Sequence, residues 1–205
     1  PKNIKKDLTI LKGLKVDYLY MPNYNDIFSF KTLNKIYLEK FSKELCGKYR
    51  KFHFKGVINV VNRFLEIINP NYLFLGKKDF QQYILINSHI KKRKIKTKVI
   101  LCKTVRENNG VVCSSRNKNL NVSQIKIAAR VYKYLKKEKN KIKNNKKFGF
   151  NKSKIYNNLM SLGLKKIDYI ECINLNNLKR PKLTKDNFNI FIAYYINNVR
   201  LIDNI

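Results

Sequence analysis

The chain has 205 residues, and its 45 lysines and arginines against 13 aspartates and glutamates give a formal net charge of +32 at neutral pH. Hydrophobic residues make up 44% of it, which excludes a disordered polycation and allows a substantial buried core in one or two domains. With only seven glycines and four prolines, the chain is not collagen-like or Pro/Gly-rich either.

The first 22 residues predict one helix and one strand. Apolar residues at helical spacing predict a helix over 4–12, and Gly13 is a typical stop signal. The segment VDYLYMP at 16–22 predicts a short strand that ends at its proline.

The next predicted elements alternate between helix and strand. Residues 57–68 carry apolar side chains at i, i+3, i+4 and i+7, so they predict an amphipathic helix that ends before Pro70. YLFLG at 72–76 predicts a buried parallel strand, and a helix over 81–91 and a strand over 97–102 follow. This alternation with short connections is typical of a parallel α/β sheet.

After about residue 112 the pattern changes to that of a small α+β unit. It predicts a long helix over 122–139, a charged connector over 139–147 and a short helix over 153–162. Two strands, over 167–175 and 189–196, complete the unit. We therefore expect it to pack on the first half of the chain.

The spacing of the cysteines bears on metal binding, and the apolar content bears on membrane insertion and cellular location. The four cysteines are far apart, with no histidine at ligand spacing, so we expect no zinc site. Neither a secretory signal nor an apolar run of about 18 residues occurs, so we expect no membrane span and a cytoplasmic location.

The positive charge has two explanations. A surplus of this size is typical of nucleic-acid-binding proteins. However, 37 of the 45 cations are lysines, accompanied by many asparagines and isoleucines, and all three residue types have A/T-rich codons. Mutational bias is therefore the favoured explanation. The lysine runs at 91–98 and 139–147 also lack the interleaved aromatics that stack on bases, so they do not favour RNA binding.

The segment GKKDFQQ at 76–82 is the first candidate site, because ligands of parallel sheets bind beyond the carboxyl ends of the strands. Gly76 permits a tight turn, and the N–H groups that open the next helix can receive an anion. Lys78 could neutralise a phosphate, Asp79 could accept from a ribose hydroxyl, and Gln82 could bind a small polar substrate. Spacing alone slightly favours the alternative, a capped turn with solvated lysines.

The segment VCSSRN at 112–117 is the second candidate, after a turn signal at Asn109-Gly110. Its two serine hydroxyls and one guanidinium suit a polyphosphate, since arginine pairs phosphate oxygens bidentately. A polar loop with a serine N-cap explains it equally well. Of the two histidines, His53 lies between two phenylalanines and is interpreted as structural, and His89 as a surface residue.

Taken in order, five motifs resemble the pantoate–β-alanine ligase family. They are RKFHFKGV at 50–57, GKKDFQQ at 76–82, VRENNGV at 105–111, SSRN at 114–117 and VRLIDNI at 199–205. The resemblance covers essentially the whole chain. It implies an α/β fold in which residues 1–111 are part of a Rossmann-like nucleotide-binding domain and residues 112–205 form an α+β lid domain.

The resemblance also implies a reaction. The family joins pantoate to β-alanine by forming pantoyl adenylate from ATP with release of pyrophosphate, after which the amine of β-alanine displaces AMP. Magnesium is expected with ATP, although no ligand for it can be assigned, and the full-length protein is expected to be a homodimer. Neither nucleic acid nor a membrane is an expected partner.

The family's site residues carry over where the motifs match. Lys78, Ser114 and Arg116 would stabilise the phosphates during transfer, and Gln82 would bind pantoate. Val105 matches a position at the adenine pocket. The implied ATP-binding set is Gly76, Lys77, Lys78, Asp79, Val105, Cys113, Ser114, Ser115 and Arg116.

Three departures from the family pattern qualify these expectations. Lys77 stands where the family has glutamate, and Lys51 and Phe52 replace Pro-Gly before His53. The family's N-terminal His-x-Gly-His motif and its N-terminal pantoate-binding glutamine have no counterpart, because the chain starts at Pro1 partway through the pattern. We therefore expect this chain alone to be inactive. A basic nucleic-acid-binding protein and a decayed, non-catalytic remnant are the alternatives.

Overall fold

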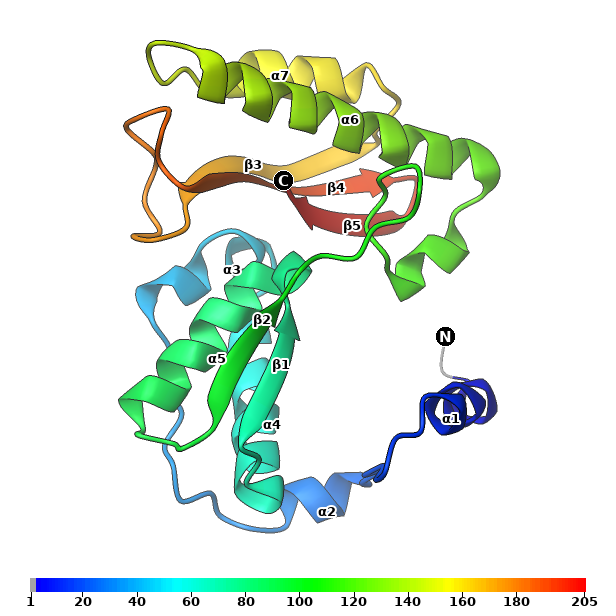
Figure 1. Cartoon of the computed structure of the whole chain (residues 1–205), viewed down its shortest axis with the longest axis vertical. Helices are drawn as coiled ribbons and strands as arrows, with labels where there is room; N and C mark the ends of the chain where they lie inside the picture. The colour runs from blue at the N-terminus through cyan, green and yellow to red at the C-terminus, as the bar shows by residue number, and fades with distance from the viewer. Residues whose placement is uncertain (1–2) are drawn as a thin grey trace.

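The computed structural model describes residues 3–205 and arranges them around two sheets (Figure 1). One sheet is antiparallel and carries two helices, α6 and α7, on its outer face. On its other side lies a two-stranded parallel sheet with helices α3, α4 and α5. The mixed α/β class, with a parallel sheet followed by a separate α+β unit, is confirmed.

At the N-terminal end, the predicted helix is confirmed and the predicted strand is wrong. Helix α1 spans Ile4–Gly13, and the Asn3 side chain accepts from the Lys6 N–H at its first turn. Residues 16–22 form no strand, because no described strand lies beside them to pair their backbone groups. The Tyr18 side chain is 93% exposed, and the five-residue helix α2 (Tyr24–Phe28) follows.

The parallel unit confirms the predicted alternation of helices and strands. Strands β1 and β2 pair in parallel, with Tyr72 opposite Lys98 and Gly76 opposite Cys102. The elements are η1 (Lys40–Lys43), α3 (Cys46–Tyr49), α4 (His53–Ile68), β1 (Tyr72–Gly76), η2 (Lys77–Asp79), α5 (Phe80–Lys92) and β2 (Lys98–Cys102).

Burial of β1 on both faces, however, is a wrong prediction. Leu73 and Leu75 pack against the core beneath the strand, whereas Tyr72 and Phe74 are 53% and 64% exposed. Among the described residues, helices cover only one face of β1, so the outward side chains of its apolar run are exposed.

The long helix α6 spans Val122–Asn144 and begins with a reciprocal capping box between Asn121 and Gln124. It therefore extends through most of the predicted connector at 139–147. Lysine is a good helix former, and buried Ile142 ties this stretch to the core, so the charge run does not end the helix. In the part of the chain described, no helix is both long enough and apolar enough to cross a bilayer.

The antiparallel sheet joins the two halves of the molecule. Helix α7 (Lys152–Met160) is followed by strands β3 (Lys166–Asn174), β4 (Phe188–Ile196) and β5 (Val199–Asn204), in the order β3-β4-β5. One face packs on α6 and α7 through residues such as Ile170 and Ile192. The other face, with Tyr169 and Phe191, shares a core with Phe54 and Phe80 of the parallel unit.

The interpretation of His89 as a surface residue is wrong. Its side chain is fully buried, because it follows Leu85 and Ile86 on the inward face of α5. Its Nδ1 accepts from the Tyr37 N–H at 3.2 Å, so its Nε2 carries the proton and donates to Asn62 Oδ1 at 2.9 Å. Burial lowers the pKa of His89, as does nearby Arg93, although Glu66 opposes them.

This environment predicts that stability falls in mild acid. The unfolded chain takes up a proton at His89 near the ordinary pKa of about 6.5, whereas the native state binds it only at lower pH. The contribution is therefore fully present above about pH 6.5 and is lost as the pH falls below it. We expect His89→Gln to make the free energy of unfolding, measured by urea titration between neutral pH and mild acid, less dependent on pH.

His53→Gln is the control, because the pKa of His53 is also lowered but its side chain is less buried. We expect a smaller change in slope for this variant. An unchanged slope in His89→Gln would contradict the role of His89.

Candidate active site

A pocket lies where strand β1 passes into helix α5. Its polar wall includes Arg50, which follows α3, and His53 at the start of α4, together with Lys78, Asp79 and Gln82. The antiparallel sheet closes the other side with Tyr169, Phe191 and Asp203. The structure therefore brings together the motifs at 50–57 and 76–82, which are separated in the sequence by most of α4 and by β1.

The turn after β1 presents its two lysines in different ways. Gly76 has a φ of −74°, which any residue can adopt, so the turn does not depend on the conformational freedom of glycine. Lys77, Lys78 and Asp79 form the single turn η2, and helix α5 begins at Phe80. Lys78 Nζ lies 3.1 Å from Asp79 Oδ2 in a partly exposed pair, which leaves the ammonium accessible to an anion.

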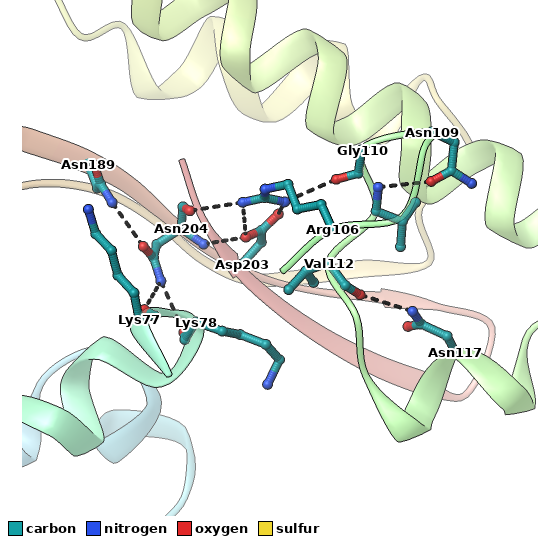
Figure 2. A network of polar contacts seen from close by, with 11 residues as sticks. Lys77, Lys78, Arg106, Asn109, Gly110, Val112, Asn117, Asn189, Asp203 and Asn204 are labelled. Atoms are coloured by element: carbon teal, nitrogen blue, oxygen red, sulfur yellow. Dashed lines mark hydrogen bonds and ion pairs between the residues drawn. The ribbon is translucent and has the colours of Figure 1, made fainter. Parts of the chain in front are cut away.

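Asn204, on the last strand, fixes this turn from behind. Its side-chain amide donates to the carbonyl oxygens of Lys77 and Lys78 at 2.8 and 3.0 Å (Figure 2). Its Oδ1 accepts from Asn189 Nδ2 at 2.8 Å, and Asn189 Oδ1 accepts from Lys139 Nζ at 2.7 Å. The backbone of the turn is thereby anchored to β4, β5 and α6.

Arg106 and Asp203 form the central ion pair of the same network. The guanidinium donates to both carboxylate oxygens at 2.7 and 2.8 Å, and also to the carbonyl oxygens of Gly110 and Asn204 (Figure 2). The Tyr132 ring lies beneath it, with its centroid 4.3 Å from the guanidinium carbon. Burial raises the pKa of Asp203, and Arg106 favours its charged form.

The turn that Arg106 holds requires glycine at residue 110. Gly110 has a φ of +89°, and an added β-carbon would lie 2.2 Å from Tyr132 Cδ1. A side chain there would therefore displace the ring on which Arg106 rests. The Asn109-Gly110 turn signal and the VRENNGV motif thus have a structural explanation.

The segment 112–117 lies on the surface beside this network. Ser114 is the N-cap of the short helix η3 (Ser115–Asn119) and accepts from the Arg116 N–H at 3.3 Å. Ser115 is exposed, as are Cys113 and Val105, whose backbones are joined by one hydrogen bond. The Arg116 guanidinium donates to the carbonyl oxygen of Arg200 at 3.1 Å.

His53 has a cationic environment. Its Nε2 lies 2.9 Å from Arg50 Nη1, and because a guanidinium only donates, the imidazole nitrogen accepts. Burial lowers the pKa of His53, with further lowering by Arg50, Arg200 and Arg116, whereas Asp79 opposes it. The pocket therefore contains a neutral imidazole among converging guanidinium and ammonium groups, an arrangement suited to a multiply charged phosphate.

Several residues that hold the site in place could not be identified from the sequence. They are Arg106, Asn189, Arg200, Asp203 and Asn204. Arg200 pairs with Asp168 at 2.8 Å and points toward Cys46, which is 3.1 Å from the Tyr169 hydroxyl. Apart from Asn189, they lie in the motifs VRENNGV and VRLIDNI, so the motifs themselves were the available signal.

The described residues do not supply a metal centre. Between residues 3 and 205, no three histidine, cysteine, aspartate or glutamate side chains are grouped so that they could hold an ion. Asp79, one of the acids that line the pocket, pairs with Lys78. The four cysteines are free thiols.

Removing Arg106 should be much more destabilising than removing an exposed ion pair. Arg106→Ala leaves the carboxylate of Asp203 buried without its partner, which typically costs about 3–5 kcal/mol. Lys152→Ala breaks the exposed pair with Glu171 and should cost about 0–1 kcal/mol. Chemical denaturation of both variants measures the difference, and equal losses would show that the Arg106 pair is not central to stability.

Comparisons with known proteins place this arrangement in a family. The pantoate-beta-alanine ligase family matches residues 1–205. A pantothenate synthetase from Francisella tularensis subsp. novicida is 38% identical over the whole chain, which covers 70% of that protein. The matching solved structures include a pantoate-beta-alanine ligase from Francisella tularensis complexed with beta-gamma ATP and beta-alanine.

The Francisella structure has a TM-score of 0.79 and 38% identity, and the match covers 100% of this chain and 70% of that one. The pantothenate synthetase of Thermus thermophilus shows the same fold, with a TM-score of 0.86 at 23% identity and coverage of 100% and 75%. This chain belongs to the pantoate–β-alanine ligase family.

Proposed function

We propose that the chain forms the ATP and pantoate sites of a ligase that joins pantoate to β-alanine through pantoyl adenylate. The observation that carries the proposal is the pocket in which Lys78, Asp79 and Gln82 face Arg50 and His53. Family membership supports it, as does the solved Francisella relative, which is complexed with an ATP compound and β-alanine.

The proposed reaction needs charge neutralisation more than covalent catalysis. A carboxylate oxygen of pantoate forms a bond to the α-phosphorus of ATP, and the bond to pyrophosphate breaks. The amine of β-alanine then attacks the acyl carbon, loses a proton and displaces AMP. Both steps bring anions together, so fixed cations lower the barrier by stabilising the developing charge.

Each predicted site residue has a proposed role in this scheme. Lys78 and Arg116 neutralise the phosphates, with the Ser114 and Ser115 hydroxyls beside them. Asp79 contacts the nucleotide, and the Gln82 amide binds pantoate. Gly76, Val105 and Cys113 complete the ATP-binding set, together with Lys77 through its backbone, whose carbonyl is held by Asn204.

Magnesium is proposed to enter with ATP and not through a site on the protein. It is bound mainly by phosphate oxygens and water in many ATP sites. The described residues offer no group of ligands for it. The ion has no assigned role in either chemical step.

That the full-length protein forms a homodimer is a further proposal, which rests on the family resemblance.

We also propose the domain division expected from sequence, with residues 1–111 as the nucleotide-binding part and residues 112–205 as the lid. In its support, the chain changes from the parallel to the antiparallel unit between β2 and α6. The shared core of Tyr169 and Phe191 with Phe54 and Phe80 indicates that the lid packs closely on the first part.

The test is pantoate-dependent adenylate formation, measured by exchange of labelled pyrophosphate into ATP. The chain alone and the chain mixed with the N-terminal segment of the Francisella relative are compared. We expect activity only in the mixture, and there Lys78→Ala should lower the rate by about 10²–10³-fold, or about 2.7–4 kcal/mol. Lys154→Ala, a change at an exposed lysine of α7, is the matched control.

An unchanged rate in Lys78→Ala would remove this lysine from its proposed role. Pantothenate formation by the chain alone would contradict the expectation of inactivity, and the same two variants would then be compared without the added segment. Loss of activity in both variants would indicate a general effect of lysine removal.

A further inference from the structure

A second basic surface lies on the side of the η2 turn away from the pocket. It is a groove of about 490 Å³, bounded by α6, the segment after β2 and the ends of β4 and β5. Figure 2 shows the Lys77 side chain pointing toward Asn189, while the Lys78 side chain points away from it. The groove and the candidate ATP pocket are therefore separate.

Five lysines from three chain segments converge on this groove. They are Lys77, Lys103, Lys136, Lys139 and Lys143. No acidic side chain lies among the residues that line it, and the charge of Arg106 is already paired with Asp203. On the outer surface of α6, by contrast, the clustered lysines all come from the one helix, as expected from composition alone.

Two of the groove's cations are held in place before any ligand is bound. Lys139 is partly buried, and its Nζ donates to Asn189 Oδ1 at 2.7 Å. Lys139 and Lys143 both lie over the Phe188 ring, 5.6 and 5.9 Å from its centroid. Burial lowers the pKa of Lys139 to about 8, and the charges of Lys143 and Lys77 contribute to this lowering.

This arrangement is electrostatically unfavourable without an anion. Like charges are brought together and partly desolvated with no carboxylate to compensate them, so a bound anion would gain from every one of them. Lys77 adds to this charge, at a position where the family resemblance expects a glutamate. A glutamate would neutralise one neighbouring lysine, whereas Lys77 makes the groove cationic throughout.

We propose that this groove binds a compact polyphosphate anion, at a site separate from the pocket that contains Lys78. Lysine ammonium groups bind phosphate oxygens as point charges, and the amides of Asn189 and Asn204 add polar contacts at the floor. The inference does not depend on the proposed ligase reaction.

The experiment is a calorimetric titration of the full chain with inorganic tripolyphosphate at physiological salt. Lys136→Glu combined with Lys143→Glu changes two exposed groove residues and should weaken binding at least about tenfold, equivalent to 1.4 kcal/mol. Lys126→Glu combined with Lys137→Glu makes the same charge change on the same helix, outside the groove, and should change affinity by less than about twofold. Lys77→Glu tests the opposite wall and should also weaken binding.

Further measurements separate this site from its alternatives. Binding should persist in Lys78→Ala, and its loss there would assign the anion to the candidate ATP pocket and overturn the proposal. No binding by the unmodified chain, or equal losses in the groove and control variants, would also overturn it. Tighter binding of a single-stranded oligonucleotide through the same lysines would replace the compact anion with nucleic acid.

A titration with ATP, performed in Lys78→Ala, tests whether the groove also accepts the phosphate tail of a nucleotide. We expect ATP to compete with tripolyphosphate for the groove, since both present the same phosphate chain. Failure of ATP to compete would contradict recognition through the phosphates alone.

Discussion

The Arg106–Asp203 pair is the interaction on which the site depends. It connects the segment after β2 to the last strand, and the neighbouring Asn204 holds the backbone of the η2 turn. A bidentate pair that is largely excluded from water fixes direction as well as distance. The candidate phosphate-binding turn is therefore positioned by the far end of the chain, and a local strand–turn–helix sequence would not hold it alone.

The antiparallel sheet makes this long-range positioning possible. Because its two faces contribute to two different cores, movement of β5 relative to α5 would disturb the packing of both. Strand β5 also has the sheet register that brings Asp203 opposite Ile192. The polar network and the two cores thus restrain the same strand. Sheet pairing, core packing and one ion pair together fix the position of the η2 turn.

Much of the fold could be predicted from local sequence, because periodicity and stop signals are local. The helix over 57–68 and the strands over 72–76 and 97–102 lie close to their predicted bounds. The errors arose where tertiary context decides. The apolar segment at 16–22 has no described neighbour to pair with, and His89 is buried because its helix face is buried.

The same distinction applies to the site. Lys78, Asp79 and Gln82 could be located because they follow a strand, and their shared pocket with His53 fits that prediction. The roles of Asp203 and Asn204 depend on contacts more than 90 residues away in the sequence, and no spacing rule reveals such contacts. Only the ordered motifs marked these residues, without indicating what they do.

Acidic residues are scarce in this chain, and their positions determine where positive charge remains. With 13 carboxylates against 45 cations, most basic side chains have no partner, so the placement of each acid decides which cations are neutralised. Asp203 and Asp168 pair with Arg106 and Arg200, two arginines that hold backbone and strands in place. The lysines of the pocket and the groove retain most of their charge, and a polyanion is the ligand that such a distribution favours. Genome-wide bias toward lysine can supply the cations, but it does not explain why the buried acids are found at the structural arginines.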